Sequence, residues 1–169
     1  MHEAPVFLPP GQKDGPYAIE RVLGHGANGI AYLAHDRTLD RKVVLKEHYP
    51  QGLCTRDADS HCLIPLDEDT ESLFAESVNR FIREARLIAS LEHPSIIKIH
   101  RVFSLSPTTC FYVMPLLEGG TLREVIHSGK RIPPRTLLSW LQTLVSALDC
   151  LNQHHIVHLD IKPGNILFT

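Results

Sequence analysis

The segment His158-Leu159-Asp160-Ile161-Lys162-Pro163-Gly164-Asn165 places a carboxylate, an ammonium and an amide within six consecutive residues, 160–165. Phosphoryl transfer uses these three groups: a carboxylate accepts the proton of the attacking hydroxyl, a cation offsets phosphate charge, and a neutral oxygen can bind magnesium. The same segment could instead be a solvated turn, because its residue types favour turns. Other parts of the sequence decide between the two interpretations.

A glycine-rich turn lies far upstream, at Gly24-His25-Gly26-Ala27-Asn28-Gly29. The spacing matches G-x-G-x-x-G, in which backbone N–H groups can approach phosphate oxygens closely. Apolar runs on both sides predict that the turn joins two strands and covers phosphates, whereas a dinucleotide site needs a helix after the glycines. Taken alone, the pattern also fits a plain glycine hairpin.

A lysine and a glutamate complete the set of candidate residues. Lys46 ends the apolar run Val43-Val44-Leu45, and an ammonium on a buried strand needs an anion, because otherwise it would lose its proton or stay in water. Glu84 follows Phe81 by three residues on the apolar stripe of a predicted helix. We therefore predict a Lys46–Glu84 ion pair that holds the ammonium for a nucleotide's phosphates. The alternative is a surface lysine at a strand end.

The hydrophobic pattern predicts an α+β chain in three parts. Residues 1–16, rich in proline and glycine, are expected to be a flexible leader; residues 17–117 hold an antiparallel sheet with one helix, and residues 118–169 a hinge and further helices. Strands are predicted at 17–24, 29–35, 41–48, 96–104 and 110–116, a long loop at 49–73, and helices at 74–93, 121–127 and 134–152.

Composition excludes several classes of protein. The net charge of −2 gives no overall field for nucleic acid, and no run of about 20 apolar residues or secretory signal is present, so no membrane segment is expected in these 169 residues. The four cysteines form no C-x-x-C pair, which favours reduced thiols and a cytoplasmic location. His48, Cys54, His61 and Cys62 fit no usual spacing for structural zinc.

Over about residues 17–169 the sequence resembles the amino-terminal half of a eukaryotic-type (Hanks-type) serine/threonine protein kinase. The resemblance rests on four features in a fixed order: the glycine turn, the strand lysine, the helix glutamate and the H-x-D-x-K-x-x-N motif. The resemblance implies the protein-kinase-like fold: a five-stranded amino-terminal lobe with one helix and the start of a helical carboxy-terminal lobe. It also implies ATP, Mg²⁺ and a protein substrate that accepts the phosphoryl group on Ser or Thr. Residues 45–50, Arg56-Asp57 and 114–122 are similar to bacterial members, in which the 49–73 loop would be a family insertion.

The resemblance also implies roles for individual residues. Asp160 resembles the catalytic base, Asn165 a magnesium ligand, Lys162 the serine/threonine form of the loop, Lys46 the phosphate-binding lysine and Glu84 its helix partner. The residues implied to contact ATP are Leu23, Gly24, Gly26, Gly29, Ala31, Val44, Lys46, Met114, Leu116, Leu117 and Leu167. Val44 stands where the family usually has Ala, and this larger side chain would narrow the adenine slot.

Two departures from the family shape the expectations for this chain. Leu159 replaces the usual arginine, so control by a phosphate–arginine bond is not expected. The sequence given ends at Thr169, before the family's D-F-G segment and activation loop, so we expect slow transfer at best and self-association through the apolar face of residues 134–152. A nucleotide-binding, pseudokinase-like regulatory module is one alternative. A small-molecule phosphotransferase of the aminoglycoside-kinase type, which tends to have His in place of Lys162, is another.

Overall fold

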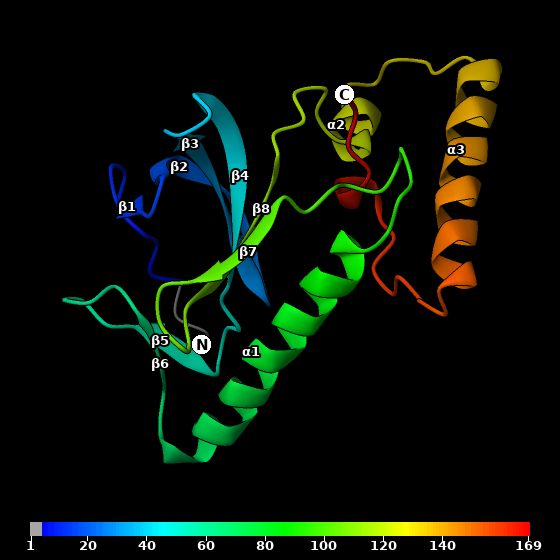
Figure 1. Cartoon of the computed structure of the whole chain (residues 1–169). Coiled ribbons are helices and arrows are strands. Elements are labelled where there is room, and N and C mark those ends of the chain that lie inside the picture. The colour runs from blue at the N-terminus through cyan, green and yellow to red at the C-terminus, as the bar shows by residue number, and fades with distance from the viewer. Residues whose placement is uncertain (1–4) are drawn as a thin grey trace. The chain divides into compact units, whose positions relative to one another are not determined.

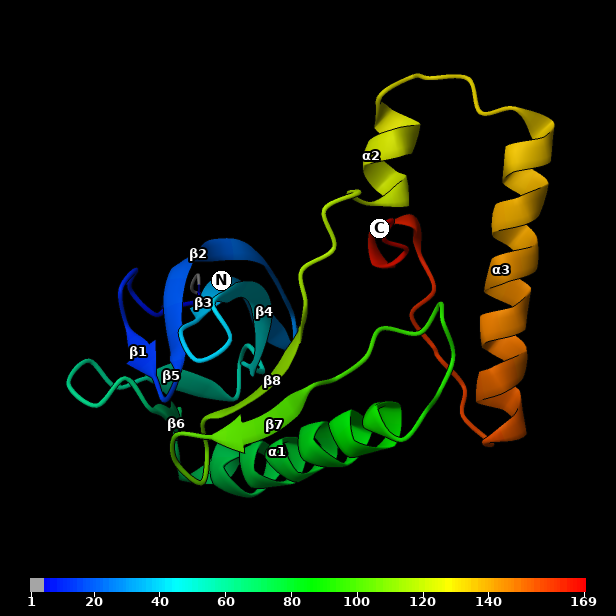
Figure 2. The same cartoon turned by 45° about the horizontal axis from the view of Figure 1, so that its top comes forward.

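The computed structural model describes residues 5–169, which form two compact units (Figures 1 and 2). The first unit contains the described residues up to Ser90 together with Lys98–Leu116. The second contains Leu91–Ile97 and Leu117–Thr169. The first unit is built around a β-sheet and the second around helices, which is the predicted α+β organisation.

An antiparallel six-stranded sheet with strand order β1-β2-β3-β4-β8-β7 organises the first unit (Figure 1). Its strands are β1 (Lys13–Asp14), β2 (Tyr17–Gly26), β3 (Gly29–Asp36), β4 (Arg41–His48), β7 (Arg101–Ser104) and β8 (Cys110–Pro115). Four predicted strands are confirmed to within two residues at each end. The predicted strand at 96–104 is too long, because β7 begins at Arg101.

The prediction of a flexible leader is wrong for residues 5–16. Lys13 and Asp14 form β1, which pairs with β2, and the side chain of Leu8 is buried in the core. The Leu8 N–H donates to the Tyr32 hydroxyl at 3.2 Å. Prolines and glycines exclude long regular elements here, but they do not prevent the segment from packing. Residues 1–4 of the predicted leader lie outside the described residues.

The predicted loop 49–73 is also partly wrong, since it holds a hairpin and the start of a helix. β5 (Cys54–Arg56) pairs with β6 (Leu63–Pro65), and α1 runs Glu68–Ala89. α1 begins before its apolar stripe, because the Asp67 side chain accepts from the Thr70 N–H while the Thr70 hydroxyl accepts from the Asp67 N–H. Only the side chains from Phe74 onward face the core, so the hydrophobic pattern missed residues 68–73. The predicted end at residue 93 is also too late, because α1 ends at Ala89.

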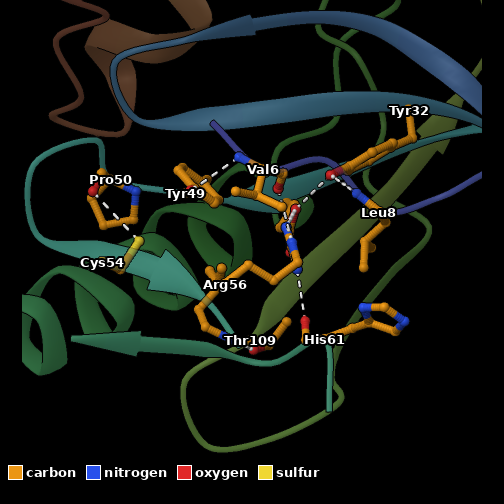
Figure 3. Close-up of polar contacts among 11 residues, drawn as sticks. Val6, Leu8, Tyr32, Tyr49, Pro50, Cys54, Arg56, His61 and Thr109 are labelled. Atoms are coloured by element: carbon orange, nitrogen blue, oxygen red, sulfur yellow. Dashed lines mark hydrogen bonds and ion pairs between the residues drawn. The ribbon is translucent and has the colours of Figure 1, made fainter. Parts of the chain in front are cut away.

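A buried ion pair joins the hairpin, the sheet and the leader (Figure 3). The Arg56 guanidinium donates from Nη2 to the Glu47 carboxylate at 2.7 Å, from Nε to the Val6 carbonyl at 2.9 Å and from Nη1 to the His61 carbonyl at 2.7 Å. The Tyr32 hydroxyl donates to the same Glu47 oxygen at 2.9 Å. The side chains of Arg56 and Glu47 are 1% and 0% exposed. All three nitrogens of the guanidinium therefore have partners away from water.

Substitution Arg56→Met should lower the free energy of unfolding by about 3–5 kcal/mol, because it leaves the Glu47 carboxylate buried without its cation. The double variant Glu47→Gln with Arg56→Met should recover much of this loss, because the neutral amide can still accept from Tyr32. Urea unfolding of the three chains measures both effects. Equal losses in the single and double variants would show that the ion pair itself is not the cause.

The second unit contains α2 (Leu122–His127), α3 (Pro134–Gln153) and a single 3-10 turn, η1 (Pro163–Asn165). The predicted helices 121–127 and 134–152 are confirmed, with Thr121 acting as the amino-terminal cap of α2. Thr121 also forms a β-bridge with Leu167, and the Phe168 ring lies 4.8 Å from the Trp140 ring of α3. Four apolar residues of α3 are exposed: Leu137, Leu138, Leu141 and Val145. Among residues 5–169 no helix combines the length and apolar character needed to cross a membrane.

Candidate active site

The sheet register gathers several predicted ATP-contacting residues on one face of the first unit. Across the ladder, Ala31 pairs with Lys46, and Val44 pairs with Met114. Directly paired residues, and residues two apart on one strand, share a sheet face, so these four side chains lie on the same side. Glu47, which follows Lys46, points to the opposite, inner face, where it meets Arg56. β4 thus supplies Lys46 to the candidate site on one face and Glu47 to the buried ion pair on the other.

The glycine turn between β2 and β3 is open on one side. A Cβ at Gly24 or Gly26 would meet nothing within 4 Å, whereas a Cβ at Gly29 would lie 2.6 Å from the Glu47 carbonyl oxygen. The fold therefore requires glycine at position 29 but not at 24 or 26. The space beside Gly24 and Gly26 suits close approach by a ligand.

The predicted Lys46–Glu84 ion pair is absent from the structure. Glu84 is exposed on α1, and the half-buried Lys46 ammonium lies 5.9 Å from the centroid of the Tyr112 ring instead. α1 packs through Phe74, Val78, Phe81 and Ala85. The Phe81 ring stacks on Tyr112 at 5.2 Å, so an aromatic pair stands beside the ammonium. The prediction from the spacing of Glu84 and Phe81 is therefore wrong: Phe81 packs on the sheet, whereas the Glu84 side chain is exposed.

His48 fastens α1 to the end of β4. Its Nε2 lies 2.9 Å from the Ser77 hydroxyl oxygen, and its ring stacks on Phe81 with centroids 4.9 Å apart. Because the Ser77 hydroxyl donates its proton to the Phe74 carbonyl, the His48 Nε2–H is the donor, and Nδ1 is left buried without a partner. Burial of the ring lowers the pKa of His48 to about 4. The histidine is therefore neutral when it holds the helix.

This burial predicts a dependence of stability on pH. Between pH 6.5 and about pH 4 the unfolded chain protonates His48 and the folded chain does not, so this group lowers stability as the pH falls, by up to about 1.4 kcal/mol per pH unit. In His48→Phe that contribution should disappear, and the unfolding free energy should fall less between pH 7.5 and pH 5 than in wild type. Denaturant unfolding at both pH values, with exposed His127→Phe as control, measures this. Parallel losses in wild type and His48→Phe would contradict it.

The three candidate groups of the second unit are brought together as the sequence predicts. The Lys162 ammonium lies 2.8 Å from Asp160 Oδ1, and the Asn165 amide nitrogen donates to Asp160 Oδ2 at 2.8 Å and to the Asp160 carbonyl at 2.9 Å. The Lys162 ammonium and then the Asn165 amide hold the pKa of Asp160 below its usual value. All three side chains are reachable from solvent, and the carboxylate is ionised at neutral pH.

The amide of Asn165 fits the role of a magnesium ligand. Both of its donor contacts go to Asp160, which leaves the neutral oxygen Oδ1 for a hard cation such as Mg²⁺. The described residues contain no group of three or more His, Cys, Asp or Glu side chains able to hold a metal ion, and the histidine–cysteine set 48, 54, 61 and 62 forms no such group.

The remaining predicted contacts lie in both units. Leu23 is partly exposed at the end of β2, and Leu116 follows β8 in the first unit. Leu117 and Leu167 belong to the second unit, where Leu167 pairs with Thr121.

Sequence reasoning missed the roles of three residues: Glu47 and Arg56, which form the buried pair behind Lys46, and Gln51, which bonds to the Gly26 and Ala27 carbonyls of the glycine turn. Glu47 was a usable signal, because it alternates with Lys46 on a strand that contains the apolar run Val43-Val44-Leu45, and an acid on the inner face of such a strand needs a buried cation. No comparable signal marks Gln51, whose contacts depend on the loop's path.

Residues 17–169 match the family described as protein kinase domain. The serine/threonine-protein kinase PrkC of Bacillus subtilis is 35% identical over 153 residues, which are 90% of this chain and 20% of that protein. The serine/threonine-protein kinase PknD of Chlamydia pneumoniae is 30% identical, over 89% of this chain and 15% of its own length. The chain therefore spans about a fifth or less of the length of these curated relatives.

Two solved structures share the fold. The apo form of PpkA-294 is 27% identical, with a TM-score of 0.80 over 94% of this chain and 56% of that chain. A mutant kinase domain of PknI from Mycobacterium tuberculosis is 23% identical, with a TM-score of 0.68 over 96% of this chain and 58% of that chain.

Proposed function

Because this chain belongs to the protein kinase family, we propose that it binds magnesium-ATP and supplies the catalytic aspartate for phosphoryl transfer to a serine or threonine of a protein substrate. The observation that carries the proposal is the cluster of Asp160, Lys162 and Asn165, joined by contacts of 2.8 Å. The relatives that the chain resembles are named as serine/threonine-protein kinases.

In this proposal the first unit binds the nucleotide. The glycine turn receives the phosphates on its open side, and Lys46, which has no carboxylate partner in the described residues, contacts them through its ammonium. Ala31, Val44 and Met114 line the adenine ring from the same sheet face, together with Leu23 and Leu116. Leu117 and Leu167 of the second unit are the remaining proposed contacts.

In the second unit Asp160 acts on the acceptor. Its ionised carboxylate orients the hydroxyl of the substrate and accepts its proton as the phosphorus–oxygen bond forms. Lys162, already beside Asp160, offsets negative charge on the transferred phosphoryl group. Asn165 directs Oδ1 to Mg²⁺, which when bound neutralises phosphate charge.

A nucleotide-binding module that regulates a partner without transfer is the second candidate. The separation of Lys46 from Glu84 favours it, because the ammonium then lacks the carboxylate that would fix its position during transfer. The two candidates differ in turnover but not in nucleotide binding.

Measuring binding and transfer separately tests the proposal. Calorimetric titration with magnesium-ATP should show saturable binding, and radiolabelled ATP should label seryl or threonyl residues of an acceptor such as casein. Asp160→Asn should lower transfer by about 100-fold or more while ATP affinity stays within about threefold of wild type. Asp149→Asn, an exposed acid on α3, is the matched control. Binding without labelling would support the second candidate, and no binding at millimolar magnesium-ATP would contradict both.

The glycines give a second prediction. Gly26→Ala should leave the free energy of unfolding unchanged or slightly raised, because its Cβ meets no atom, but should weaken ATP binding by obstructing the phosphates. Gly29→Ala should destabilise the fold, because its Cβ would lie 2.6 Å from the Glu47 carbonyl. Thermal unfolding and ATP titration of both variants separate the two effects. A Gly26→Ala chain with unchanged ATP affinity would show that phosphates do not approach this glycine.

A further inference from the structure

We propose that Gln51 is a positioning residue for the glycine turn. By bonding to two carbonyls of the turn, it keeps the backbone N–H groups of Ala27 and Asn28 directed toward the phosphates. The inference rests on the proposed nucleotide-binding function and assigns a role to a residue of the insertion. Gln51 lies between the end of β4 and the hairpin β5–β6, outside the motifs that carry the family resemblance.

The segment Tyr49–Gln51 bonds to three consecutive carbonyls of the turn. The Gln51 N–H donates to the Ala27 carbonyl at 2.9 Å, and its side-chain Nε2 donates to the Gly26 carbonyl at 3.1 Å. The Tyr49 N–H donates to the Asn28 carbonyl at 3.2 Å. The contact of Tyr49 continues the ladder between β3 and β4. Of the two Gln51 contacts, one reaches Gly26, the last residue of β2, and the other reaches Ala27 in the turn itself.

These contacts also fix the direction of the N–H group in each peptide whose carbonyl is bonded. In a trans peptide the C=O of one residue and the N–H of the next point in opposite directions. Because the carbonyls of Gly26 and Ala27 face Gln51, the N–H groups of Ala27 and Asn28 point away from it. Neither N–H has a hydrogen-bond partner within residues 5–169. Two adjacent free N–H groups on one side of a turn form an anion-binding surface.

Without Gln51 the direction of the Gly26 carbonyl would depend on the pairing of Gly26 with Gly29 across the hairpin. Glycine adopts a wide range of backbone angles, and Gly26 has open space around it, so the Gly26–Ala27 peptide could turn over. A reversed peptide would present a carbonyl oxygen to the phosphates and repel them. The side-chain amide of Gln51 opposes this reversal because it holds the Gly26 carbonyl on the other side.

The backbone that carries Gln51 is itself fixed. Tyr49 and Cys54 are buried, and the Pro50 carbonyl accepts from the Leu53 N–H at 3.1 Å and from the Cys54 thiol at 3.5 Å (Figure 3). Arg56 then fastens the end of the segment to Glu47 in the core. Gln51 therefore acts from a rigid support, which a side chain needs in order to hold a flexible turn.

The test uses Gln51→Met, which keeps the length of the side chain and removes its donor, with exposed Gln142→Met of α3 as the matched control. Calorimetry with magnesium-ATP and with adenosine should show about a three- to tenfold loss of ATP affinity in Gln51→Met and no change for adenosine, which has no phosphates. Exchange of the backbone amide at position 51, whose N–H donates to the Ala27 carbonyl, should become faster in the free variant. Gln142→Met should match wild type in all three measurements.

The outcomes distinguish the inference from the function on which it rests. If wild type binds magnesium-ATP and Gln51→Met binds it equally well, or loses ATP and adenosine affinity in the same proportion, the inference is wrong and the proposed function stands. If wild type binds neither ligand, the proposed function fails and the inference fails with it. Thermal unfolding checks that both variants fold.

Discussion

The buried ion pair between Glu47 and Arg56 is the interaction on which the first unit most depends. It joins β4 to the hairpin β5–β6 and, through Tyr32 and the Val6 carbonyl, to β3 and the leader. Side chains alternate along a strand, so Glu47 points into the core because Lys46 points to the proposed nucleotide face. The position of the proposed phosphate-binding lysine is therefore tied to a charge pair on the opposite side of the sheet.

The parts of the site that depend on local sequence could be predicted, and those that depend on packing could not. Asp160, Lys162 and Asn165 lie within one short turn, so their meeting follows from the chain itself. Lys46 and Glu84 come from separate elements, and their approach depends on how α1 is rotated on the sheet. That rotation is set by the rings of His48, Phe81 and Tyr112, whose stacking no spacing rule anticipates.

The secondary structure, too, was predictable where it depends on local sequence and not where it depends on packing. Strands and helices with a clear apolar period were predicted to within a few residues, whereas α1 begins earlier because of a polar cap. The leader packs through the buried side chain of Leu8, the pairing of β1 with β2 and the main chain of Val6. The hairpin β5–β6 was missed because its strands are three residues each and its contacts are made with other elements, through the Arg56–Glu47 ion pair and the hydrogen bonds of Leu63 with Thr108 and Thr109. Proline and glycine content describes which regular elements are excluded, not whether a segment is attached to the core.

The attachment of the leader at Val6 places few demands on the side chain at that position. Both contacts there use the main chain: the Val6 N–H donates to the Tyr49 hydroxyl at 3.3 Å, and its carbonyl accepts from Arg56 at 2.9 Å, while its side chain is half exposed. Every amino acid except proline carries both groups. Evolutionary drift at this position could thus change size and polarity freely while the docking of the chain persists.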